Sequence, residues 1–181
     1  MEILENYHNE VLKESHGNPL FDEFKDPMPI TFGQFNAGDW PAITPAKAVF
    51  KGVFGFLPNR SRFDIQRGME RAIQDKGDSW LKNHYRISFP MLNSEGNVIP
   101  VDQPLVLSLQ EAIQKNSYPG KIAAMTASCD AWLYNNQAKI PTVVFGSGSL
   151  KYAHSNEEQI SLKEILDAAL ILKDFVESFC Q

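Results

Sequence analysis

The spacing of the apolar residues changes between residues 92 and 100, and no other feature of the sequence constrains the fold as strongly. Before that point, segments with helical spacing and segments with strand-like alternation follow one another at 3–15, 30–37, 46–56, 62–76 and 84–91. The order helix, strand, strand, helix, strand is typical of an antiparallel sheet with helices on one face. We therefore expect residues 1–92 to form an α+β domain.

After a turn at residues 93–97, the pattern becomes typical of an α/β domain. The expected elements are a long final helix and four shorter segments, namely helices at 104–116 and 130–136 and strands at 122–126 and 140–145. Ser161 and Glu164 have the spacing of a capping box at the start of the final helix. The apolar positions of that helix predict one buried stripe, formed by Leu162, Ile165, Leu166, Ala169, Leu172 and Val176. Alternating helices and strands predict a parallel sheet in residues 93–181.

Composition and charge argue against two kinds of partner. The chain has 43% hydrophobic and 22% charged residues and a formal net charge of −5. This mild acidity argues against nucleic acid, because phosphate binding requires a basic face. No apolar run reaches the roughly 18 residues that cross a bilayer, and the acidic start differs from a secretory signal. We expect a cytoplasmic protein in which Cys129 and Cys180 are reduced structural thiols.

The stretch from residue 140 to residue 158 contains the best candidate for a ligand site. An apolar strand leads into the Gly146–Gly148 turn, and the following loop carries His154 and two glutamates. In α/β sheets, ligands collect beyond the carboxyl ends of the strands. Glycines also allow a ligand to approach exposed backbone N–H groups, which suits an anionic group.

Interpretations without a ligand stay open for these residues. A histidine in a polar loop is more often a surface residue, and Glu157 and Glu158 have the position of helix-start charges favoured by the helix dipole. The Gly146–Gly148 turn lacks the Lys-Ser/Thr of a phosphate loop, and Ser147 lacks the flanking residues of a nucleophile elbow. The remaining histidines have no metal-ligand spacing and are interpreted as structural or surface residues: His8, His16 and His84.

Three motifs resemble a known family. Phe145-Gly-Ser-Gly followed by Ala153-His-Ser-Asn-Glu-Glu158 resembles the last motif of the co-catalytic zinc family that includes acetylornithine deacetylase, succinyl-diaminopimelate desuccinylase, aminoacylase and glutamate carboxypeptidase. Ser128-Cys-Asp-Ala131 resembles a pocket motif of the same family, and residues 36–46 resemble a turn of its inserted lid domain. Ser147 stands where the family usually has proline, and Glu157 where it usually has Asp or Asn.

The resemblance implies a fold and a function for most of the chain. It implies an α+β lid, through which such enzymes usually dimerise, at 1–92, and the C-terminal portion of an α/β catalytic domain at 93–181. It implies hydrolysis of the amide bond of an N-acyl amino acid or small peptide by a site with two zinc ions. His154 is the implied metal ligand, and the implied substrate-binding residues are Ser128, Gly146, Ser147 and Gly148.

Most of the family's catalytic residues have no counterpart in these 181 residues. The family takes a second histidine, a bridging aspartate, a general-base glutamate and two acidic ligands from its N-terminal half. Catalytic zinc needs about three protein ligands and an open position, so His154 by itself is not expected to hold it. We therefore expect no catalytic residue in this chain and no activity of the chain alone. Residues 53–56 also lack the arginine that binds a substrate carboxylate in some relatives, so the substrate stays open.

Two classes of function follow as hypotheses. The first is the C-terminal portion of a zinc-dependent amide hydrolase, as a fragment, a truncated reading frame or one half of a split enzyme with a separate N-terminal half. The second is a non-catalytic dimerisation or ligand-binding module derived from such an enzyme. The first strand of the family's lid also has no counterpart in these residues. An incomplete lid sheet exposes a strand edge, which favours a homo-oligomer.

Overall fold

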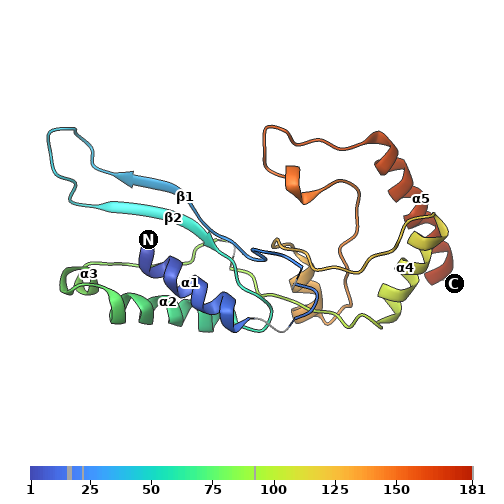
Figure 1. Ribbon diagram of the computed structural model, residues 1–181, viewed down its shortest axis with the longest axis horizontal. Coiled ribbons are helices and arrows are strands. Elements are labelled where there is room, and N and C mark those ends of the chain that lie inside the picture. The colour runs from blue at the N-terminus through green and yellow to red at the C-terminus, as the bar shows by residue number, and fades with distance from the viewer. Residues whose placement is uncertain (16–17, 22, 92, 181) are drawn as a thin grey trace. The chain divides into compact units, whose positions relative to one another are not determined.

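The computed structural model divides into two compact units (Figure 1). It describes the following residues: 1–15, 18–21, 23–91 and 93–180. The first unit consists of Met1–Gly96 and Thr126–Ser128, and the second of Asn97–Met125 and Cys129–Gln181. The interpretation of His16 as a structural or surface residue lies outside the described residues.

The first unit combines a two-stranded sheet with helices. Its elements are α1 (Glu2–Glu14), β1 (Ile30–Ala37), β2 (Ala48–Phe54), α2 (Arg62–Lys76) and α3 (Ser79–Asn83). β1 and β2 run side by side and antiparallel (Figure 1), and their register is irregular between Thr31 and Gln34. The mixture of helices and strands expected from the sequence is therefore confirmed in this unit.

The core of the first unit lies between α1 and α2. Its buried side chains recur at helical spacing on both helices, which is why the spacing of apolar residues predicted these helices. The buried side chains are Leu4, Val11, Ile65, Met69 and Ile73. Phe32 and Phe54 of the sheet pack against this cluster. α2 begins where predicted because the Ser61 hydroxyl accepts a hydrogen bond from the backbone N–H of Asp64, which satisfies one donor of the first turn.

The buried His8 connects α1 to the segment before β1. Its Nε2 lies 2.7 Å from the carbonyl oxygen of Met28, and its ring packs edge-on against Phe54 at a centroid distance of 4.8 Å. A hydrogen bond of this kind offsets the cost of burying a polar ring. The interpretation of His8 as a structural residue agrees with this position.

The predicted strand at 84–91 is wrong. Among the described residues, only β1 and β2 form a ladder. Tyr85, Ile87 and Phe89 nevertheless pack against the core of the first unit. The alternation in the sequence therefore records an extended segment with one face on the core, and not a strand paired in the sheet.

The second unit is built on a pair of packed helices. Its elements are α4 (Pro104–Lys115), the π-helix η1 (Leu133–Ala138), the 3₁₀-helix η2 (Leu150–Tyr152) and α5 (Leu162–Phe179). Leu109 and Ala112 of α4 pack against Ile171 of α5, and the two helices lie side by side in Figure 1. The predicted helices at 104–116 and after residue 161 are confirmed. Within the described part of the chain, no helix combines the length and apolarity needed to cross a membrane.

The predicted strands at 122–126 and 140–145 are wrong, and the described residues contain no parallel sheet. In the segment 140–145, the side chain of Asn135 binds the backbone of Thr142. The N–H of Thr142 donates to Oδ1 of Asn135 at 2.8 Å, and Nδ2 of Asn135 donates to the carbonyl of Thr142 at 2.9 Å. Val143 and Phe145 pack against the α4–α5 core. The segment is thus apolar because it covers the two helices on one face.

The predicted buried stripe of α5 and the predicted capping box are also wrong. Leu162 is 79% exposed, and the other predicted stripe residues are exposed as well, whereas Ile171 is buried. The reason is that α4 covers a different face of α5 from the one that carries most of its leucines. Ser161 is the N-cap residue, but among the described residues its side chain makes no capping hydrogen bond.

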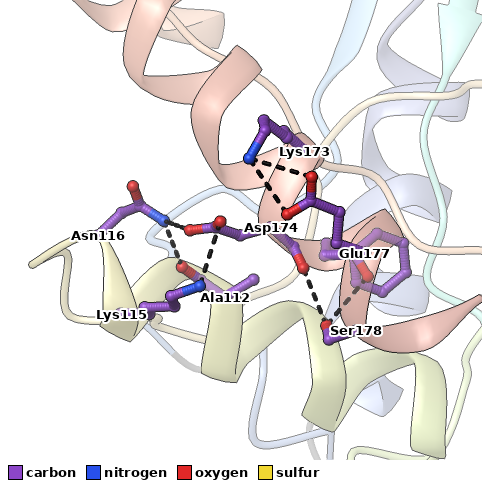
Figure 2. A network of polar contacts seen from close by, with 8 residues as sticks. Ala112, Lys115, Asn116, Lys173, Asp174, Glu177 and Ser178 are labelled. Atoms are coloured by element: carbon purple, nitrogen blue, oxygen red, sulfur yellow. Dashed lines mark hydrogen bonds and ion pairs between the residues drawn. The ribbon is translucent and has the colours of Figure 1, made fainter. Parts of the chain in front are cut away.

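A polar network joins the C-terminal end of α4 to α5 (Figure 2). Asp174 accepts a hydrogen bond from Nδ2 of Asn116 at 2.9 Å and forms an ion pair with Nζ of Lys115 at 3.2 Å. Asn116 also donates to the carbonyl of Ala112 at 3.0 Å. The Asn116 hydrogen bond, followed by the Lys115 charge, holds the pKa of the Asp174 carboxyl below its ordinary value of 3.8.

This network predicts acid sensitivity of the second unit. Because the pKa of Asp174 is lower in the folded state, its stabilising contribution is present above about pH 4 and is lost as the pH falls through the folded pKa. We expect Asp174→Asn to lower the melting temperature at pH 7, and this difference to shrink below pH 4. Thermal melts by circular dichroism from pH 7 to pH 2.5 measure it. A difference that stays constant over this range contradicts the prediction. Glu177→Gln, which alters an exposed ion pair on the same helix, serves as the control and should change less.

Candidate functional site

The loop between residues 146 and 160 carries four of the five predicted site residues. Gly146 is exposed, and no described atom lies within 4 Å of the position that a Cβ would take there. Gly148 has a φ of +88°, a left-handed conformation that residues with a side chain adopt rarely. Ser147 lies half-buried between them. The two glycines therefore give an open turn at the entrance of the loop.

The glycine turn is attached to the first turn of α5. The backbone N–H of Gly148 donates to Oε2 of Glu164 at 3.1 Å. A carboxylate also interacts favourably with the N-terminal end of a helix, where the backbone N–H groups are exposed. The Gly148 amide that we expected to be available to an anionic ligand is thus bonded to a carboxylate of the chain itself.

His154 lies on the surface in a left-handed backbone conformation, with a φ of +60°. Its backbone N–H donates to Oε2 of Glu158 at 3.0 Å. The Ser155 hydroxyl donates to the carbonyl of Tyr152 at 2.8 Å, which closes the same turn. Non-glycine residues with positive φ are uncommon, although histidine is enriched among them, and such residues cluster at functional sites. The turn presents the imidazole outward on a backbone held by two hydrogen bonds.

The interpretation of Glu157 and Glu158 as helix-start charges is wrong. α5 begins at Leu162, and Glu158 instead bonds the backbone of His154. Sequence reasoning therefore missed the part that Glu158 and Glu164 take in holding the loop. The hydrogen bond from His154 to Glu158 joins residues four positions apart, so the sequence could have suggested it. The bond from Gly148 to Glu164 spans 16 positions and gave no such signal.

Ser128 is the fifth predicted site residue. It is exposed and belongs, by its contacts, to the first unit, whereas the loop with His154 belongs to the second. Cys129, its neighbour, is half-buried and carries a free thiol. The predicted pocket role of Ser128 stays a prediction.

Zinc does not fit the described residues of this chain by themselves. Across 1–15, 18–21, 23–91 and 93–180, no group of three or more His, Cys, Asp or Glu side chains is placed to hold a metal ion. His154 contributes one imidazole from an exposed turn. Catalytic zinc requires about three protein ligands, so any complete site takes further ligands from other residues.

Comparison with known proteins identifies the class of protein. The sequence pattern of peptidase family M20/M25/M40 matches residues 15–178, which span both units and the whole candidate loop. The chain belongs to peptidase family M20/M25/M40. The resemblance recognised from the Gly146–Gly148 and His154 motif is thereby confirmed.

Three relatives show how much of a family member the chain represents. It is 30% identical over 138 residues to N-formyl-4-amino-5-aminomethyl-2-methylpyrimidine deformylase of Bacillus subtilis, an alignment that covers 69% of this chain and 32% of the relative. It is 34% identical over 104 residues to an uncharacterized metallohydrolase of Methanocaldococcus jannaschii, covering 56% and 29%. It is 26% identical over 174 residues to acetylornithine deacetylase of Yersinia pseudotuberculosis, covering 94% and 41%. The matched region therefore spans about a third of the length of these relatives.

Proposed function

We propose that this chain supplies one metal ligand and part of the substrate pocket of a metal-dependent amide hydrolase. The observation that carries the proposal is the turn from Tyr152 to Glu158, which holds the exposed His154 on a left-handed backbone in the loop that follows the glycine turn. Membership of the M20/M25/M40 family and the relative named a metallohydrolase support a hydrolase that uses a metal. Zinc is the metal that we propose.

The substrate class that we propose is an N-acyl amino acid or a small peptide. The relative named acetylornithine deacetylase supports this class by name. The relative named a deformylase acts by its name on an N-formyl pyrimidine and supports only the removal of an N-acyl group. In this proposal Ser128, Gly146, Ser147 and Gly148 contact the substrate. The bond between the Gly148 amide and Glu164 opens when an anionic group of the substrate takes that amide.

We propose that residues other than the described residues of this chain complete the zinc site. One exposed imidazole does not hold zinc in competition with water, and the described residues bring no second and third ligand beside it. We therefore propose that the 181 residues alone do not turn over substrate. The first unit is then the lid and the second the C-terminal portion of the catalytic domain.

The second candidate is a non-catalytic dimerisation module. It is favoured by the β1–β2 hairpin. Among the described residues this sheet has two strands, so both are edge strands, and they expose Phe35, Phe50 and Val53. Exposed apolar residues beside strand edges are typical of surfaces that pair with another chain. This candidate predicts self-association of the chain and no change in zinc affinity when His154 is replaced.

Zinc affinity tests the first candidate. We expect titration calorimetry to give weak zinc binding to the chain alone. Tight binding is expected after addition of a polypeptide that carries the unmatched part of the Bacillus subtilis relative. His154→Ala should then weaken binding by about 100-fold or more, because even groups behind metal ligands contribute about 10- to 100-fold.

The matched control is His84→Ala. His84 is a second exposed histidine, stacked on Trp80 in the first unit, and its replacement should leave zinc affinity unchanged. Tight zinc binding that His154→Ala does not weaken would contradict the assignment of His154 as a ligand. Hydrolysis of an N-acetyl amino acid, measured in the same mixtures, tests the proposed reaction separately.

A further inference from the structure

The loop between residues 146 and 160 binds carboxylates of its own chain at two backbone positions. Gly148 and His154 have positive φ, +88° and +60°. The N–H of Gly148 donates to Oε2 of Glu164 at 3.1 Å, and the N–H of His154 donates to Oε2 of Glu158 at 3.0 Å. Backbone N–H groups in turns of this kind form concave sites for anions. Both N–H groups are therefore placed to bind a carboxylate, and each already has one.

The two contacts differ in the length of chain that they close. His154 and Glu158 lie in one short turn, which the bond from the Ser155 hydroxyl to the Tyr152 carbonyl closes a second time. Gly148 and Glu164 are 16 positions apart. The entropic cost of closing a loop rises with its length, so the contact of Glu164 is the easier one to exchange. The Glu164 side chain is also exposed, and water can solvate it when it leaves the Gly148 amide.

The surroundings of the Gly148 amide suit a carboxylate that is attached to a short apolar group. Gly146 is exposed, and no described atom lies within 4 Å of the position of a Cβ there. On the other side, Cδ1 of Ile160 lies 3.4 Å from the position that a Cβ of Gly148 would take. A ligand at this amide thus meets open space at Gly146 and an apolar side chain at Ile160.

We propose that Glu164 is an intramolecular competitor for the anionic group of the substrate at the Gly148 amide. The inference rests on the proposed function, which places Gly148 in the substrate pocket, and it adds a residue that determines specificity. A ligand carboxylate replaces the bond to Glu164 with another bond to a charged acceptor, whereas a neutral ligand offers a weaker one. Glu164 therefore selects for anionic ligands and lowers their apparent affinity by the fraction of amide that it leaves free.

Binding of acetate to the full 181-residue chain tests the proposal. Heteronuclear NMR follows the backbone amide signal of Gly148 during titration at constant pH and ionic strength. We expect Glu164→Ala to lower the apparent dissociation constant of acetate by about tenfold or more, because the amide is no longer occupied. Acetamide, which is neutral and has nearly the same shape, should not compete with Glu164 and should leave the wild-type Gly148 signal unchanged.

The matched control is Glu157→Ala. Glu157 is an exposed glutamate of the same loop, and its described hydrogen bond to Ser155 is made by its backbone N–H. Its replacement removes the same charge without freeing the Gly148 amide, so acetate affinity should change by about twofold or less. An equal gain in both variants overturns the proposal, because the effect is then one of net charge. So does an unchanged affinity in Glu164→Ala.

A measurement on the wild-type chain keeps the test independent of how the variant folds. The Gly148 amide is bonded to Glu164, whereas the amide of Gly146 has no partner among the described residues. After correction for intrinsic rates, Gly148 should exchange its amide hydrogen more slowly than Gly146, and equal rates overturn the proposal. Circular dichroism checks that Glu164→Ala retains α5. Competition at Gly148 together with zinc binding that does not involve His154 overturns the proposed function alone.

Discussion

Replacement of Ile65 by alanine is expected to lower the free energy of unfolding of the first unit by about 2–5 kcal/mol. Ile65 is 3% exposed and lies in the cluster between α1 and α2 with Leu4 and Met69. The substitution removes buried methyl and methylene groups and leaves a cavity that the two helices fill only in part. Denaturant unfolding followed by circular dichroism measures the loss, and amide hydrogen exchange in α2 assigns it to this unit.

The control for this prediction is Glu70→Ala. Glu70 lies on the same helix and is exposed, so its replacement should change the free energy of unfolding by about 0.5 kcal/mol or less. Similar losses at Ile65 and Glu70 would show that the first unit is not held together by the α1–α2 core. Unchanged stability of Ile65→Ala would lead to the same conclusion.

The second large effect is expected at Gly52, in the middle of the hairpin. A Cβ at this position would lie 2.2 Å from the carbonyl oxygen of Thr31 on β1. The clash is with backbone at the irregular part of the register, so the two strands must separate locally. We expect Gly52→Ala to cost about 1–3 kcal/mol, the usual range for forced overpacking. The same denaturant measurement reports it, with faster amide exchange across β1 and β2.

Gly33 provides a matched control on the same hairpin. No described atom lies within 4 Å of the position of a Cβ there. Gly33→Ala should therefore be close to neutral, or slightly stabilising because alanine restricts the unfolded chain. Equal destabilisation by the two substitutions would contradict the register described for β1 and β2.

In the candidate site, the sequence identified residues but not their contacts. The motif around His154 was sufficient for the family, and the glycine at 148 occupies a left-handed position that only a glycine accepts easily. The left-handed conformation of His154 and the hydrogen bond from Gly148 to Glu164 were not predictable. The bond from Gly148 to Glu164 joins residues 16 positions apart. The glutamates at 157 and 158 lie nearer in the sequence, and nothing in the sequence favours Glu164 over them. The metal and substrate roles of these residues stay predictions.

In the fold, the sequence by itself determined the longer helices, whereas the short α3 and η2 were not predicted. α2 lies where the spacing of its apolar residues placed it, and α4 begins at the proline expected in its first turn. Helical hydrogen bonds join residues four positions apart, so the local sequence decides them. Strand pairing depended on the tertiary structure. The strand at 84–91 was predicted from alternation and those at 122–126 and 140–145 from short apolar runs, and none of the three forms a ladder among the described residues. A strand requires a neighbour distant in the sequence, and alternation records only that one face packs on something apolar.

α5 shows the same division within one element. Its extent followed from the sequence, while the choice of Ile171 as its buried residue did not. The helix has apolar residues on two faces, so hydrophobicity alone does not tell which face α4 covers. That choice depends on where α4 and the segment 140–145 pack, and therefore on the tertiary structure.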